Sequence, residues 1–493
     1  MKAARVVAAA ALAAPALCQD APLVSSEALQ ELITLDNLLA GSQKLQDIAD
    51  ANGGNRAFGG AGHNATVDYL VETLEATGYY DVYKHEFVEL FSSGTSSLSI
   101  GKDKVESAQA MTYTPSGKIK KPVVQVANLG CAAEDYPENI KNKVALISRG
   151  TCTFAEKSVN AKTAGASAAI IYNNIEGAIS GTLGGVGDYV PTVGISLADG
   201  TSILAELANK TVVADLDVQF VLENRTTFNV IAETKTGDHE NVLTLGGHTD
   251  SVAAGPGIND DGSGTIGSLG VAVALSKFSV KNAVRFCFWS AEEFGKLGSF
   301  AYLKSINQTA SEVAKIRAYL NFDMIASPNY VYGIYDGDGS AFNFSGPDGS
   351  QTIEKDFEDF YKSKGEASIP SIFSGRSDYA AFLENGIPSG GLFTGAEVIK
   401  TPEEAALFGG VAGESYDQNY HQPGDTIDNL NHEAYLLNTQ SIANSVAKYA
   451  VSFEGIPKPT SRKRSAPPNY HAHTKKAVHG HAHGPCGEHP EAI

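Results

Sequence analysis

The sequence predicts an α/β protein with a doubly wound, mostly parallel mixed sheet, helices on both faces of that sheet, and a small β-rich inserted domain. Two patterns predict this class. Between residues 226 and 452, continuous apolar runs of strand length alternate with helical segments. Such runs suit strands that are buried on both faces of a parallel sheet. Between residues 105 and 222, shorter β-rich runs stand between Gly and Pro breaks, which is typical of a separate compact unit.

The length and charge of the chain limit its class. A chain of 493 residues exceeds one ordinary domain, and a content of 43% hydrophobic and 19% charged residues describes a globular protein. The formal net charge of −19 argues against nucleic acid as a partner. We expect no nucleic-acid partner, no membrane partner and a monomer.

The first 18 residues have the pattern of a secretory signal peptide. Lys2 and Arg5 form a small positive region, and residues 6–17 are apolar. That stretch is too short for a bilayer, which needs about 20 apolar residues. No later segment is long and apolar enough for a membrane helix. We therefore expect residues 1–18 to direct the protein out of the cell, although the cleavage position stays open.

Glycosylation and cysteine patterns agree with secretion. Five sequons are the expected glycosylation sites: Asn64, Asn209, Asn224, Asn307 and Asn343. We expect a disulfide between Cys131 and Cys152, since both lie in the inserted domain of a secreted chain. It would close a loop of about 20 residues and contribute about 3 kcal/mol. Two free thiols are the alternative. Cys287 lies in a buried-strand pattern and is expected to be an inert core thiol.

The main domain begins at residues 27–104. Apolar residues at helical spacing predict helices over 29–49 and 63–79, the second ending at Gly78, and alternation predicts a strand over 81–90. The inserted domain, residues 105–222, should contain one helix over 154–166. Its expected strands are 121–130, 143–150, 168–174 and 190–196.

The second part of the main domain covers residues 223–453. Crossover helices are expected over 264–278 and after Glu293. The expected buried strands are 242–247, 283–290, 318–325 and 330–336. Residues 454–493 are rich in Pro and His with almost no apolar pattern, and we expect a disordered tail. The basic cluster Arg462–Arg464 is its predicted processing site.

Acids and histidines stand at the ends of several of these segments. The six of interest are His248, Asp260, Glu292, Glu293, Asp323 and His421. Nitrogen and oxygen ligands without sulfur suit zinc, and the carboxylates are numerous enough to hold two metals and leave one base. Each fragment alone also fits an exposed turn or a helix cap. Their combination, three of them at strand ends, favours a metal site.

Individual positions suggest roles. His248 follows an apolar strand, and Asp250 is a natural acceptor for the second N–H of a metal-bound imidazole. Asp260 has two oxygens with which to bridge two metals, and Asp261 would cap or orient the following helix. Glu292 and Glu293 would repel each other at a buried strand end without a cation or a proton. No convincing nucleophile elbow is present, so a serine hydrolase is a poor interpretation.

The motifs GGHTDS, NDDGSG, SAEEFG, NFDMI, SGRSDYAAF and YHQPGDT resemble those of a known family. Residues 27–452 resemble the secreted fungal di-zinc leucine aminopeptidases, close to vacuolar aminopeptidase Y. Residues 120–200 resemble a protease-associated domain, through GCAAEDY, LISRGTCTFAEKSVNAKTAGA and IIYNN. The resemblance implies a zinc exopeptidase fold, two Zn²⁺ per chain, and peptide substrates with a free N-terminus, from which Leu and other apolar residues are released.

The resemblance also implies roles. His248 and Asp323 would hold one zinc and Glu293 and His421 the other, with Asp260 as the bridge. The catalytic residues would be Glu292 as the general base, Asp250 as the support of His248, and Tyr420 at the oxyanion. The family's Ser–Asp pair is Ser377–Asp378 here, and Tyr379 follows it where many relatives have His. A carboxypeptidase of the same fold and a non-catalytic receptor-like ectodomain are the alternatives.

Overall fold

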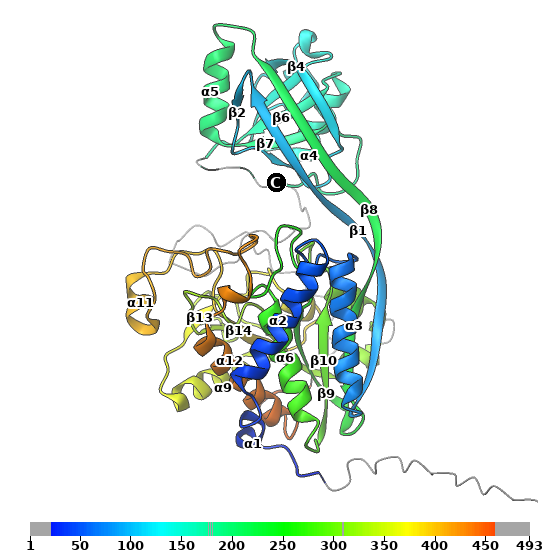
Figure 1. The fold of residues 1–493 in the computed structure, drawn as a ribbon, viewed down its shortest axis with the longest axis vertical. Helices are drawn as coiled ribbons and strands as arrows, with labels where there is room; N and C mark the ends of the chain where they lie inside the picture. The colour runs from blue at the N-terminus through cyan, green and yellow to red at the C-terminus, as the bar shows by residue number, and fades with distance from the viewer. Residues whose placement is uncertain (1–20, 176, 178, 180, 308–309, 459–493) are drawn as a thin grey trace, which may run out of the picture.

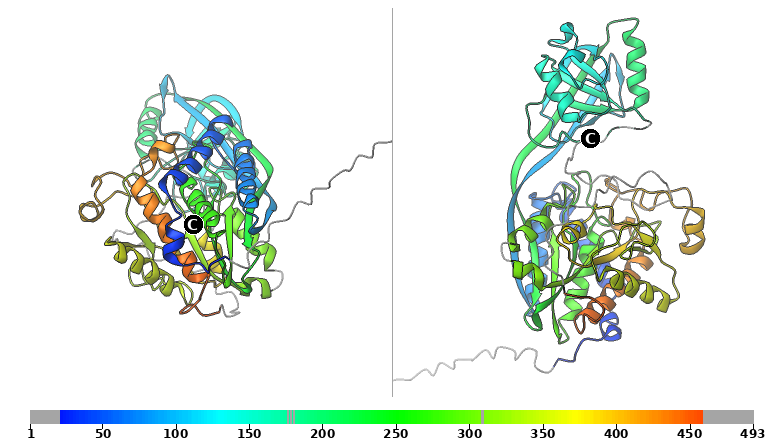
Figure 2. Two further views of the ribbon diagram at one scale, coloured as in Figure 1. Left: turned by 60° about the horizontal axis from the view of Figure 1, so that its bottom comes forward. Right: turned by 180° about the vertical axis from the view of Figure 1, so that it is seen from behind.

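Two bodies joined by a long two-stranded ribbon make up the protein (Figure 1). The computed structural model describes residues 21–458 except 176, 178, 180 and 308–309. Strand β1 (Tyr80–Ile100) leaves the main domain and strand β8 (Val213–Thr234) returns to it. They pair antiparallel from Tyr80 opposite Thr234 to Ile100 opposite Ala214. Figure 2 shows the ribbon from behind, running between the inserted domain and the main domain.

The main domain contains the mixed sheet that the sequence predicts, in the order β13-β12-β14-β11-β9-β10-β8. Neighbours among β10, β9, β11 and β14 are parallel, whereas β8 is antiparallel to β10 and β12 is antiparallel to β14. The bounds are β9 Asp238–His248, β10 Asn282–Trp289, β11 Ile316–Phe322, β12 Gly333–Tyr335, β13 Ile369–Ser371 and β14 Ser389–Phe393. The predicted fold class is confirmed.

Both faces of this sheet are buried, as the continuous apolar runs require. In β10, Phe286 and Phe288 belong to one core, while Cys287 and Trp289 belong to the core on the other face. This alternation follows from the two-residue period of a strand. Burial raises the pKa of Cys287. The thiol is therefore protonated and inert.

Helices cover both faces of the sheet. In Figure 1, the face toward the viewer carries α2, α3 and α6. The larger core packs helices α1 Ser26–Gln30, α2 Leu35–Ala51, α3 Ala61–Ala76, α6 Gly262–Leu275, α9 Ser350–Lys364 and α12 His432–Tyr449. The other core packs α7 Leu297–Ile306 and α10 Tyr379–Glu384. The remaining helices of this domain are α8 Ala310–Lys315, α11 Pro402–Phe408 and the 3₁₀ turn η3 Ile427–Asn429.

One predicted helix is two. The single helix expected over 29–49 breaks after Gln30, and α2 begins at Leu35 with Thr34 as its N-cap. The Thr34 hydroxyl accepts a hydrogen bond from the Asn37 N–H at 3.4 Å. An N-cap side chain stabilises a helix start, and here it outweighs the continuous apolar spacing.

The inserted domain has a second parallel sheet, β4-β5-β6-β7, edged by β3 and joined to β8 through β4. Its elements are β2 Asp103–Lys104, β3 Gln109–Ala110, β4 Gly117–Gln125, η1 Ala133–Asp135, η2 Glu138–Ile140, β5 Val144–Ser148, α4 Phe154–Thr163, β6 Ala168–Tyr172, β7 Thr192–Ile195 and α5 Leu197–Leu207. The prediction of one helix was wrong, because Ser196 caps a second one, α5. The division at residues 105 and 222 stays a prediction.

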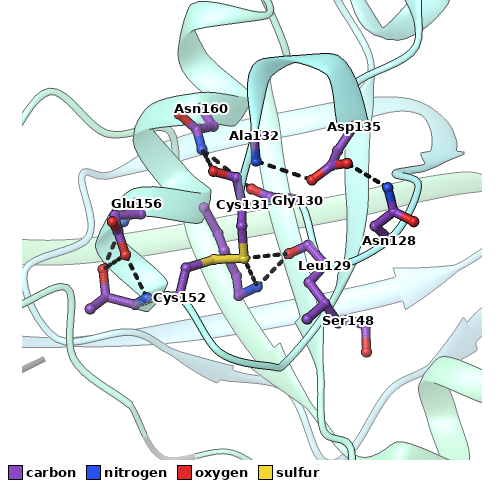
Figure 3. Close-up of a disulfide and its surroundings, with 12 residues drawn as sticks. Asn128, Leu129, Gly130, Cys131, Ala132, Asp135, Ser148, Cys152, Glu156 and Asn160 are labelled. Carbon is purple, nitrogen blue, oxygen red and sulfur yellow. Dashed lines mark hydrogen bonds between the residues drawn. A yellow bond between two sulfur atoms is a disulfide. The ribbon is translucent and has the colours of Figure 1, made fainter. Parts of the chain in front are cut away.

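Cys131 and Cys152 form a disulfide in this domain (Figure 3). Hydrogen bonds order the loop around it. The Asp135 carboxylate accepts from the Ala132 N–H at 3.0 Å and from the Asn128 amide at 2.7 Å. The Asn160 amide donates to the Cys131 carbonyl at 3.1 Å. The disulfide therefore joins this loop to the segment that precedes α4.

The folded chain extends beyond Phe453, where the tail was expected to begin. Ile456 is buried, and its carbonyl accepts a hydrogen bond from the Arg317 guanidinium at 2.5 Å. The predicted signal peptide, residues 1–18, and the predicted processing site at Arg462–Arg464 lie outside the described residues. In the part of the chain that the structure describes, no helix has the length and apolar character needed to cross a membrane.

Candidate active site

The site lies at the carboxyl ends of three adjacent strands. His248 is the last residue of β9 and lies opposite Trp289, the last residue of β10. β11 ends at Phe322, immediately before Asp323. Because β9, β10 and β11 are parallel neighbours, the residues that follow them meet at one edge of the sheet.

Six predicted site residues come together there. Asp260 lies between two histidines: its Oδ1 is 3.2 Å from His248 Nε2, and its Oδ2 is 3.2 Å from His421 Nε2. Glu293 Oε2 is 2.9 Å from His421 Nε2. Asp323 Oδ1 and Glu292 Oε2 lie 3.7 and 3.8 Å from His248 Nε2. One carboxylate thus faces both halves of the site.

His248 presents a lone pair to this cluster. Its Nδ1 lies 3.1 Å from the Asp250 carbonyl oxygen, an acceptor, so Nδ1 carries the proton. In the neutral imidazole Nε2 is then an acceptor as well, and it has no hydrogen-bond partner among the described residues. The same holds for Asp260 Oδ2 and Asp323 Oδ1. Buried acceptors that face one another require a cation or a proton between them. The donor set of nitrogen and carboxylate oxygen fits Zn²⁺.

The pKa shifts report the same excess of negative charge. Burial lowers the pKa of His248, but Asp323, Asp260 and Glu292 raise it more, so it lies well above the ordinary value. Burial, with the nearby Asp323, raises the pKa of Glu292 well above its ordinary range. Burial also raises the pKa of Asp250 to about 7. The protein alone does not balance these buried carboxylates.

The comparisons with known proteins agree with this geometry. Residues 229–446 match Peptidase family M28, and residues 119–203 match the PA domain. A probable leucine aminopeptidase 2 of Aspergillus fumigatus is 56% identical over 441 residues, 88% of this chain and 87% of that protein. Leucine aminopeptidase 2 of Trichophyton rubrum is 50% identical and covers 91% of each chain. The chain belongs to peptidase family M28. It is an aminopeptidase with an inserted PA domain, and its predicted enzymatic class is confirmed.

Solved structures show the same fold. An aminopeptidase from Aneurinibacillus sp. strain AM-1 is 26% identical, with a TM-score of 0.66 over 90% of this chain and 99% of that chain. A structure described as a zinc aminopeptidase from Bacillus subtilis is also 26% identical, with a TM-score of 0.63 over 84% of this chain and 95% of that chain. Both structural similarities extend over most of this chain.

Asp250 contacts its neighbours differently from the expectation. Its carboxylate is 3.7 Å from His248 Nδ1, whereas its backbone carbonyl is 3.1 Å from that atom. The carboxylate Oδ1 instead accepts the backbone N–H of Glu292 at 3.0 Å. Asp250 therefore orients His248 through its carbonyl, and it fixes the turn that carries Glu292 through its side chain.

Asp261 is a structural neighbour of the site. Its Oδ2 accepts the His248 N–H at 3.0 Å, and its Oδ1 accepts the N–H groups of Gly264 and Met324 at 2.9 and 3.0 Å. Asp261, His248 and Asp323 are close enough to hold a metal. Because three N–H groups already occupy the Asp261 oxygens, we assign it to capping α6 and aligning the strand ends. A Cβ at Gly264 would lie 2.0 Å from the Phe322 carbonyl, so this close approach needs glycine.

The loop of His421 is tied to the loop of Asp260. The Asp425 carboxylate accepts the backbone N–H groups of Asn259 and Asp260 at 2.8 and 3.0 Å. The Tyr420 ring stacks on the His421 ring at a centroid distance of 3.8 Å. The role of Tyr420 at the oxyanion stays a prediction. These contacts place His421 within reach of Asp260 although 161 positions separate them in the chain.

Left-handed backbone conformations gather at the site. Ala291, Met324 and His421 have φ values of 59°, 55° and 57°. Each such residue costs about 1–3 kcal/mol and persists where the surrounding structure enforces it, often in active sites. Here Ala291 precedes Glu292 and Met324 follows Asp323, whereas His421 is itself a candidate ligand.

Two contributors were missed by the sequence reasoning. The Ser377 hydroxyl donates to Asp323 Oδ2 at 2.5 Å and accepts from the Asn321 amide at 2.8 Å. The Ser–Asp motif is visible in the sequence, but nothing in it indicates a contact with Asp323. Arg56 donates to three carbonyls beside the site. It lies about 200 positions from them, and no local pattern signals it. Tyr379, also buried, accepts the Gly375 N–H at 3.0 Å and closes the turn before Ser377.

The five sequon asparagines are exposed in the structure. Attachment of glycans to them stays a prediction.

Proposed function

We propose that this M28 aminopeptidase is a secreted enzyme that holds two Zn²⁺ ions and releases N-terminal residues, Leu and other apolar ones first, from peptides. The position of Asp260 carries the proposal, since its two oxygens lie 3.2 Å from His248 and 3.2 Å from His421. A carboxylate placed between two imidazoles is suited to bridging two metals. Relatives named leucine aminopeptidase 2 support the substrate class.

The positions of the candidate ligands assign them to two zinc ions. His248 and Asp323 would hold one ion, and Glu293 and His421 the other. Asp260 would contact both. The 2.9 Å separation of Glu293 Oε2 and His421 Nε2 supports the second pair. Ser377 and Asp425 would hold Asp323 and Asp260 in place through their hydrogen bonds.

Bound zinc would lower the pKa of a shared water toward about 7 and polarise the scissile carbonyl. The remaining chemistry belongs to the chain. Glu292 would accept a proton at its carboxylate and return it to the leaving amine. Its Oε1 is buried without a hydrogen-bond partner among the described residues, so this oxygen is free to accept that proton. Tyr420 would donate a hydrogen bond to the oxyanion.

Secretion is supported by three features. The N-terminal 18 residues have the signal-peptide pattern. A disulfide joins Cys131 and Cys152, and such bonds persist in oxidising compartments. All five sequons are exposed. We propose the extracellular medium as the place of action.

Paired substrates test this function. Leu-p-nitroanilide should be cleaved, whereas its N-acetylated form should not, because an aminopeptidase needs a free α-amine. A chelator should abolish cleavage, and added Zn²⁺ should restore it. Full activity of the metal-free protein would overturn the metal mechanism. Cleavage of peptides from the carboxyl end alone would instead favour a carboxypeptidase.

A further inference from the structure

Arg56 is a fully buried arginine with no acidic partner in contact. It lies in the connection between α2 and α3, and its exposed fraction is 0%. Within the described part of the chain, no carboxylate forms an ion pair with it. A buried charge without a counterion is costly unless hydrogen bonds and nearby charges compensate it. The groups around the Arg56 guanidinium therefore indicate how its burial is compensated.

All of its guanidinium hydrogen bonds go to one short segment beside the metal site. Nε donates to the Pro256 carbonyl at 2.8 Å, Nη2 donates to the Gly257 carbonyl at 2.6 Å, and Nη1 donates to the Thr249 carbonyl. Its backbone N–H donates to the Ser251 hydroxyl at 2.9 Å. Residues 249–257, the clamped segment, follow His248 directly and end three residues before Asp260.

The clamped segment has little freedom of its own. Gly257 has φ +63°, and a Cβ there would lie 2.4 Å from the Asp260 carbonyl oxygen. The Ser251 hydroxyl also bonds the Gly255 carbonyl at 2.9 Å. The segment folds around the guanidinium, which fixes both of its ends. The charge of Arg56 also acts on the buried carboxylates of Asp250, Asp425 and Asp260.

We propose that Arg56 is a positioning residue of the metal centre: by binding residues 249–257 at both ends, it sets the separation of His248 and Asp260. This inference rests on the proposed zinc site. Arg56 touches neither substrate nor metal ligand side chains.

Arg56→Lys tests this role, because Lys keeps the charge but cannot make the planar set of three hydrogen bonds. Arg317→Lys is the matched control. Arg317 is also buried, bonds the Ile456 carbonyl at 2.5 Å and the Asn241 amide oxygen at 2.6 Å, and lies about 20 Å along β11 from Asp323. Zinc affinity is measured by competition with a chelator, and the Tm of the metal-free protein is measured by calorimetry.

Zinc binding should weaken about 10- to 100-fold in Arg56→Lys, as for other residues that orient ligands. In Arg317→Lys it should stay within about twofold of the wild type, because the sites are distant. Both variants should lower the metal-free Tm, but only Arg56→Lys should also reduce the rise in Tm that zinc produces. Wild-type zinc affinity in Arg56→Lys would show that Arg56 serves the scaffold only, and would overturn the inference.

Ser251→Ala keeps the inference testable if Arg56→Lys does not fold. It removes one hydrogen bond of the clamp, so zinc affinity should fall about two- to tenfold. An unchanged affinity in Ser251→Ala would overturn the inference. A wild-type protein that binds no zinc would overturn the proposed function, and this inference with it; a wild type that binds zinc alongside unaffected variants would overturn the inference alone.

Discussion

The two parallel sheets of this protein have opposite chemistry at their carboxyl ends. In the inserted domain, β5 is followed by Arg149 and β6 by Asn173, and the guanidinium donates to the amide oxygen at 3.2 Å. β7 is followed by Ser196, which caps α5. There the polar groups that follow the strands satisfy one another or a helix end.

In the main domain, the corresponding edge gathers acceptors that do not satisfy one another. His248 Nε2 and Asp323 Oδ1 face each other at 3.7 Å, and neither has a hydrogen-bond partner among the described residues. Parallel strands bring loops together in both domains. A functional site is therefore marked by an unbalanced set of buried donors or acceptors at such an edge, rather than by the edge itself.

Replacing Glu292, the proposed base at the edge of the main-domain sheet, should have the largest effect on activity. Glu292→Gln keeps the shape of the side chain but cannot accept a proton, so kcat should fall about 10²- to 10⁴-fold. Zinc content, measured by atomic absorption, should remain that of the wild type. Retention of most of the activity would show that another group is the base.

The same substitution at the neighbouring residue, Glu293→Gln, is the matched variant of Glu292→Gln. Glu293→Gln should lower zinc content, because an amide is a poorer ligand than the carboxylate that lies 2.9 Å from His421 Nε2. Activity should fall as a consequence. A variant with full zinc content and lost activity would mean that the roles of Glu292 and Glu293 are exchanged.

A smaller effect is expected from removing the hydrogen bond to Asp323. Ser377→Ala deletes the hydroxyl that donates to Asp323 Oδ2 at 2.5 Å. Zinc affinity should fall about tenfold, in the range found for groups that orient metal ligands. Chelator competition measures it, and Ser374→Ala, three residues earlier in the chain, is a control. Equal affinities in both variants would show that the hydroxyl does not hold Asp323 in place.

The smallest effect on catalysis should come from the inserted domain. Replacing Cys131 and Cys152 together by Ser removes a cross-link worth about 3 kcal/mol to unfolding. Thermal unfolding of the inserted domain should shift to lower temperature, while kcat/KM for Leu-p-nitroanilide stays unchanged. Loss of activity at temperatures where this domain remains folded would show that the two sheets are functionally coupled.

The sequence predicted the sheet, and it named residues that the structure brings together at the strand ends, because both depend on local signals. Apolar runs mark the buried strands, and the motifs after them carry His248, Glu292 and Asp323. It did not predict α5, whose start depends on the Ser196 cap, or the break before α2. Arg56 and Ser377 were also missed, because their roles come from contacts with residues distant in the chain. The left-handed turns at Ala291 and His421 have no signal in side-chain type.

The structure changes the expected role of one residue. Asp250 was expected to hold His248 with its carboxylate, yet the nearer atom is its carbonyl, and the carboxylate supports the Glu292 turn instead. Sequence spacing places such residues in the same loop. It does not determine whether a backbone or a side-chain oxygen makes the contact.

The two-zinc site can be tested by a crystal structure with anomalous data collected at the zinc absorption edge. Two zinc peaks are expected in each chain, one between His248 and Asp323 and one between Glu293 and His421, with Asp260 contacting both. A single peak, or zinc bound away from Asp260, would contradict it.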